Sequence, residues 1–130
     1  MISDHVEFES DHFAVVPHED EETNPGIYGL ALAEWVAAQL RARGVSIEAV
    51  IAEDFGRCVM VKRRPFVLLI ACANASDSKT RWQMFIALER NILSRLFGRA
   101  DPQPDLARLR DHFRTIVAEV PGVSNIAWNP

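Results

Sequence analysis

The sequence has few of the residues from which catalytic and metal centres are commonly built. Its 130 residues include two cysteines and four histidines, and the cysteines do not form a C-x-x-C pair. The histidines do not have the spacing of zinc ligands either. Phosphate-binding glycine loops, the dinucleotide-binding glycine pattern and the G-x-S-x-G motif of serine hydrolases are also missing. The sequence therefore predicts no metal site and no cofactor, and it favours a protein that is not an enzyme.

Long apolar segments are missing as well. No apolar run approaches the roughly 18–20 residues that a membrane-spanning helix needs. The chain begins MISDHVEFESD, which is acidic, whereas a secretory signal begins basic and continues apolar. These features predict a soluble cytoplasmic protein without a membrane partner, in which Cys58 and Cys72 are reduced and buried.

Basic residues are absent from positions 1–40, which hold nine of the 18 acidic residues. The rest of the chain carries the other nine acids and all 14 Lys and Arg residues, and the net charge is −4. Lys62-Arg63-Arg64 forms a compact basic turn, but the protein is acidic overall, so nucleic acid is not the favoured partner. Segregated charge indicates either an interaction surface or neutralisation within the fold.

The most apolar stretch of the chain runs from Phe66 to Cys72. Both faces of a strand over these residues are apolar, which predicts a position inside a sheet. A second strand is predicted just before it, over about Arg57 to Lys62. The turn between them lacks Gly and Asn and contains Pro65, so we expect a loop longer than two residues. If the strands pair symmetrically about Pro65, the Cys58 and Cys72 thiols face each other.

A first amphipathic helix is predicted over about Pro25 to Arg43, because apolar residues recur there at spacings of three and four. Thr23 or Asn24 is the expected N-cap, and Gly44 is a natural stop. Trp35 lies in the middle of the apolar stripe and should be more than half buried.

A last helix is predicted from about Asp101 to Val120, with Phe113 in the middle of its stripe and also more than half buried. The tail after this helix is expected to add a short edge strand that buries Ile126 and Trp128.

Three further segments complete the predicted fold. Glu7 to Val16 and Ser46 to Ala52 are expected to contain strands, and Arg81 to Leu88 fits a strand or a helix, with a strand favoured. A short helix near Asn91 to Phe97 should follow. The result is an α+β fold with a mostly antiparallel sheet of four to five strands, in the order β-α-β-β-β-β-α-α. Two helices should cover one face, and the short helix, the tail or a second subunit the other.

The loop before the first helix is strongly acidic and has no apolar residue to anchor it. A helix dipole stabilises acids only near its first turn, and consecutive acids repel one another. We therefore expect this loop to face outward and to steer association with a protein that has a basic surface. The candidate partner-binding residues are Glu19, Asp20, Glu21, Glu22, Glu53 and Asp54.

An alternative hypothesis is a small enzyme or small-ligand binder. Its site would lie where the start of the first helix meets the turn that follows the second strand. The residues of this alternative pocket are Asn24, Tyr28, Glu53, Asp54 and Arg57.

A sequence pattern begins at Asn24-Pro25-Gly26-x-x-Gly29-x-x-Leu32-Ala33-x-Trp35 and continues with Glu53-Asp54-Phe55-Gly56. It resembles a pattern of small uncharacterised bacterial single-domain proteins, and Arg95-Leu96-Phe97-Gly98 and the final helix add to the likeness. The resemblance implies a bacterial origin and one domain over residues 1–130, and it implies no activity.

Small size, acidic character and the lack of catalytic motifs together predict a bacterial binding or accessory protein without catalysis. An immunity protein and a secretion chaperone are the two types that fit best. A homodimer also remains open, since one face of the predicted sheet lacks cover.

Overall fold

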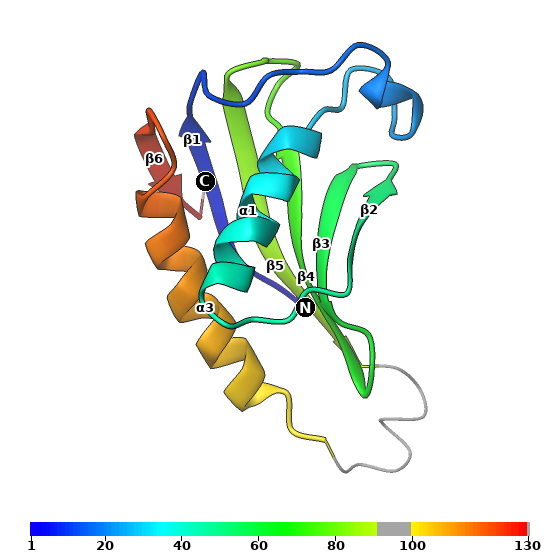
Figure 1. Ribbon diagram of the computed structural model, residues 1–130, viewed down its shortest axis with the longest axis vertical. Coiled ribbons are helices and arrows are strands. Elements are labelled where there is room, and N and C mark those ends of the chain that lie inside the picture. Colours follow the sequence, from blue (N-terminus) through cyan, green and yellow to red (C-terminus); the bar gives the residue numbers. More distant parts are fainter. Residues whose placement is uncertain (91–99, 130) are drawn as a thin grey trace.

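The computed structural model describes residues 1–90 and 100–129. Six strands form one antiparallel sheet in the order β2-β3-β4-β5-β1-β6 (Figure 1). The strands are β1 (Ile2–Glu9), β2 (Ala49–Glu53), β3 (Gly56–Lys62), β4 (Phe66–Asn74), β5 (Arg81–Arg90) and β6 (Ser124–Trp128). The helices are α1 (Leu30–Ala42), α3 (Gln103–Ala118) and the short 3-10 helix η1 (Glu19–Glu21). The predicted α+β class and antiparallel sheet are confirmed, but the prediction of four to five strands is wrong.

The apolar stretch that begins at Phe66 forms β4, which lies between β3 and β5 inside the sheet as predicted. The β3–β4 connection spans residues 63–65, so the expectation of a loop longer than two residues is confirmed.

The two cysteines lie on opposite faces of the sheet, contrary to the expected face-to-face arrangement. Cys58 pairs with Ala71, whereas Cys72 pairs with Arg57. A register shift between Met60 and Lys62 explains the difference, because a shift of one residue turns every later side chain to the other face.

Both long helices pack on the same face of the sheet, in front of it in Figure 1. Their apolar stripes and the facing strand residues form the core. Phe113 is fully buried and Trp35 is mostly buried, its ring edge-on to that of Phe13. Both expectations about these aromatic residues are therefore confirmed.

The N-terminal boundaries differ from the predicted ones. The first strand was expected within Glu7 to Val16, but it runs from Ile2 to Glu9. Its residues that face the core are Val6 and Phe8. Helix α1 begins at Leu30 with Gly29 as N-cap, so neither Thr23 nor Asn24 caps it.

The C-terminal half follows the prediction more closely. Arg81 to Leu88 is strand, within β5, and the tail forms the edge strand β6. Trp128 is mostly buried, but Ile126 is 40% exposed, so its expected burial is wrong. The short helix predicted over Asn91 to Phe97 falls outside the described residues. None of the helices in residues 1–90 and 100–129 is long and apolar enough to cross a membrane.

Candidate functional site: the uncovered face of the sheet

The face of the sheet opposite α1 and α3 is apolar over several strands. No helix of the described chain lies over this face. The strand pairings place its residues in rows that cross the sheet. One row consists of Ile51, Cys58, Ala71 and Phe85, and the next consists of Ala49, Met60, Leu69, Ala87 and Ile2. Cys58, Met60 and Ala71 are buried among their neighbours, Ile2 is exposed, and the other five residues are partly exposed. The face therefore has no layer of described helices over it, and it is partly open to solvent.

A groove of about 480 Å³ runs over these rows. Met60 and Cys58 are buried in its floor, while Phe55 and Ile2 are 52% and 64% exposed at its margins. The complete lining is Ile2, Ile51, Glu53, Phe55, Cys58, Met60, Val67, Leu69, Phe85, Ala87 and Glu89. A smaller hollow shares Phe55 and Phe85 with the groove and extends it towards Gln83. Exposed apolar surface of this kind commonly marks a binding site.

The groove carries negative charge and no positive charge among its lining residues. Glu53 and Glu89 are its only ionisable residues besides Cys58, and both carboxylates are exposed. The groove therefore combines apolar walls with two acids, a composition that favours a ligand with apolar groups and positive charge.

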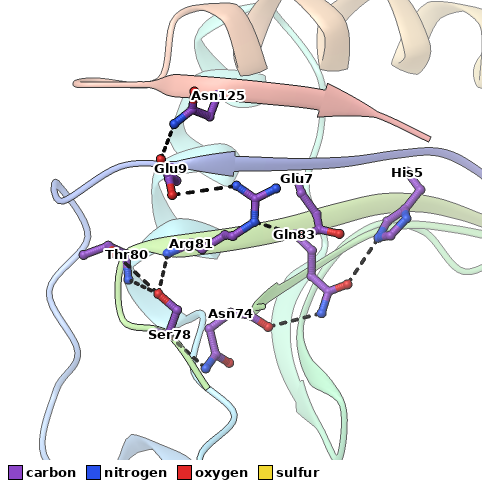
Figure 2. Close-up of polar contacts among 9 residues, drawn as sticks. All are labelled: His5, Glu7, Glu9, Asn74, Ser78, Thr80, Arg81, Gln83 and Asn125. Carbon is purple, nitrogen blue, oxygen red and sulfur yellow. Dashed lines mark hydrogen bonds and ion pairs between the residues drawn. The ribbon is translucent and has the colours of Figure 1, made fainter. Parts of the chain in front are cut away.

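A polar network occupies the other end of the same face (Figure 2). Arg81 lies between two acids, with its Nε 3.1 Å from Glu7 and its Nη1 3.9 Å from Glu9. His5 contacts Gln83 at 3.2 Å, and its ring lies edge-on to that of Phe85, with 6.0 Å between ring centroids. The only guanidinium of this network is thus paired with acids, so the network leaves the face with an excess of negative charge.

The acidic loop predicted to face outward is partly internal. Glu19 is only 6% exposed, and its carboxylate accepts hydrogen bonds from the backbone N–H groups of Val16, Gly29 and Leu30 at 2.8, 3.2 and 3.1 Å. It supplies the cap of α1 that Gly29 cannot provide. The expectation that the whole loop faces outward is therefore wrong for Glu19, whose charge is used to begin the helix.

The side chain of Arg57 holds the same loop in place. This side chain is buried and donates to the Glu19 backbone carbonyl at 2.8 Å and to the Glu22 carboxylate at 3.1 Å. Glu22 and Glu21 remain largely exposed, and Asp20 accepts from the backbone N–H of Gly26 at 2.9 Å. Part of the segregated negative charge is thus neutralised within the fold.

Asn74 binds the segment between this loop and α1. Its side-chain oxygen accepts from the Tyr28 N–H at 2.9 Å, and its amide group donates to the carbonyls of Gly26 and Ser78, each at 3.0 Å. Asn24 donates through its backbone to the Asp54 carbonyl at 2.9 Å. Of the residues of the alternative ligand pocket, Asn24 therefore contacts Asp54 through the backbone, Arg57 binds the acidic loop, and Glu53 lines the groove on the uncovered face instead.

Of the residues predicted from sequence, Glu53 alone lines the groove on the uncovered face. Sequence reasoning did not assign Phe85, Leu69 or Ile51 to a site, although the apolar character of both faces of β4 indicated that a second face needed cover. The absence of a polar face on β4 was therefore the sequence feature that indicated the groove.

The two thiols are free and buried, as the sequence predicted. Burial and, secondarily, the charge of Glu53 raise the pKa of Cys58 to about 11, and burial raises that of Cys72 as well. Neither thiol is therefore a nucleophile near neutral pH.

The raised thiol pKa values predict a loss of stability in alkaline solution. Unfolded cysteine ionises near pH 9.0, whereas folded Cys58 stays protonated to about pH 11, so deprotonation favours the unfolded chain between these values. We expect the free energy of unfolding to fall as the pH rises through this window and to fall less in Cys58→Ala. Urea unfolding of both proteins across the window measures the difference, and equal declines would contradict the prediction.

Within the described residues, no group of three or more His, Cys, Asp or Glu side chains could hold a metal ion. Comparison of the chain with models of protein families, with curated proteins and with solved structures finds no match.

Proposed function

We propose that this chain is a non-catalytic binding protein of bacteria, and that its uncovered sheet face binds a segment of another protein that carries apolar residues flanked by Lys or Arg. The observation that supports this most strongly is the apolar groove on a face that no described helix covers. Its walls come from five neighbouring strands, β2, β3, β4, β5 and β1, whose hydrogen bonds hold them in place. Such a surface can bind without a large rearrangement.

The charge of the face determines the chemistry of the partner. Glu53 and Glu89 lie in the groove itself, and Glu7 and Glu9 outnumber Arg81 beside it. A second copy stacked face to face would bring these acids towards the same acids of its neighbour, which costs free energy. A basic partner segment instead gains from them. Immunity proteins and secretion chaperones both bind another protein, so either type fits this proposal.

Position-specific photo-crosslinking in the native host tests the proposal. A photoreactive phenylalanine analogue at Phe85 should yield a discrete adduct with one other protein, and the same analogue at Thr115, exposed on α3, should not. A Phe85 adduct with a second copy, with a small molecule or with nothing would overturn the proposal.

The protein identified in this way should then bind in purified form. Phe85→Ala should weaken that binding at least tenfold, because anchoring aromatic residues commonly contribute about 2 kcal/mol. Reversal of the groove charge in Glu53→Lys should weaken it further and alter its salt dependence. Glu34→Lys, which changes an exposed acid on α1, is the matched control and should bind as the wild type does.

A further inference from the structure

The two edges of the sheet are protected to different degrees. An edge strand exposes unpaired N–H and C=O groups, and folded proteins commonly block them with Lys, Pro or a bulge. At the β6 edge, the pairing with β1 has a register shift, and Asn125 has a positive φ of 50°. Both features twist this edge away from regular pairing.

Strand β2 has none of these protective features. Its residues are Ala49-Val50-Ile51-Ala52-Glu53, without Lys, Arg or Pro, and all five pair with β3 in an unbroken register. No described strand lies on its outer side. The strand is therefore regular and carries mainly apolar side chains, and its outer backbone groups have no described strand partner.

The sequence of β2 is also complementary to itself about Ile51. In an antiparallel pair of two β2 strands centred there, Ile51 opposes its own copy and Val50 opposes Ala52. Glu53 then opposes Ala49, so no acid within the strand faces another. Glu48 and Asp54, just outside the strand, would oppose each other and limit the pairing to these five residues.

From this asymmetry we infer that the protein forms a two-fold dimer in which β2 pairs with β2 of a second copy, giving one continuous sheet of twelve strands from two sheets of six. The two-fold axis of an antiparallel strand pair is perpendicular to the sheet, so the uncovered faces of both copies lie on the same side. Ile51 lines the groove of each copy. The two grooves therefore meet at the shared edge, and the binding surface becomes twice as long.

Disulfide trapping tests this register directly. Because Ile51 pairs with Cys58 within one copy, all the cysteine variants are made in a Cys58→Ala chain, which prevents a competing disulfide inside the copy. In Ile51→Cys, the two introduced cysteines would then face each other with Cα atoms about 4.5–5.5 Å apart, within the range that a disulfide bridges. Mild oxidation should therefore link nearly all chains into dimers. Ala52→Cys is the matched control, because its copies lie too far apart along the strands to join. Ile126→Cys on the β6 edge should also remain unlinked.

Opposite charges introduced at Ile51 give a second, independent test of the dimer. The wild-type chain should sediment with twice its mass of 14.6 kDa. Ile51→Lys and Ile51→Glu should each be monomeric, because each places like charges opposite one another, and an equimolar mixture of the two should form a dimer again. A monomeric wild type, a dimer that persists in both variants, or oxidation that links Ala52→Cys as efficiently as Ile51→Cys would overturn the inference. Its failure would leave the photo-crosslinking result at Phe85 unaffected, because that experiment reports heterologous binding.

Discussion

Replacing Phe113 by alanine should lower the free energy of unfolding by about 3–5 kcal/mol. Phe113 is fully buried in the middle of α3, where its ring meets that of Trp128 edge-on with 5.8 Å between centroids. Its removal both loses apolar burial and leaves a cavity between the helix and the sheet. Urea unfolding monitored by circular dichroism measures the change.

Phe55→Ala is the matched control, since it removes the same ring from a position that is 52% exposed. Its free energy of unfolding should stay within about 0.5 kcal/mol of the wild-type value. Equal losses in the two variants would show that α3 does not pack as described.

The second large effect is expected at Glu19. In Glu19→Ala, the three N–H groups that now donate to the carboxylate lose their acceptor, and one of them is buried. Unsatisfied donors and the loss of charge-assisted hydrogen bonds together should cost about 3 kcal/mol. Amide exchange at Gly29 and Leu30 should also accelerate, because the start of α1 is no longer held.

Glu21→Ala is the control for this prediction. The Glu21 side chain is 73% exposed and contacts only His18 among the ion pairs of the described residues, so its removal should change stability by less than about 0.5 kcal/mol. If Glu19→Ala were as stable as Glu21→Ala, the acidic loop would not be the cap of α1. Replacing all four acids at once would hide this difference, because Glu19 alone would account for the destabilisation.

The elements defined by strong local patterns were predictable from sequence. Strand β4 is apolar on both faces, and the stripes around Trp35 and Phe113 have helical spacing, so their type and burial follow from the nearby residues alone.

The features that depend on distant contacts were not predictable. Pro25 looked like the first residue of a helix, but α1 begins at Leu30 because Glu19, ten residues before Gly29, supplies the cap. The bulge near Lys62 has no mark in the sequence, and it moved Cys58 and Cys72 to opposite faces. The groove itself needs five strands in register, which no single segment specifies.

Alternate side chains of β4 point to opposite faces of the sheet, so neighbouring residues of this strand meet different requirements. Leu68 and Ile70 point towards the helices and are buried, whereas Val67 and Leu69 point into the groove. Under the proposed function, substitutions at Val67 and Leu69 alter which partner is recognised, while the packing that holds the fold together stays intact. The same proposal implies that changes of specificity are confined to one side of the sheet, so one scaffold serves several partners without a change in its core.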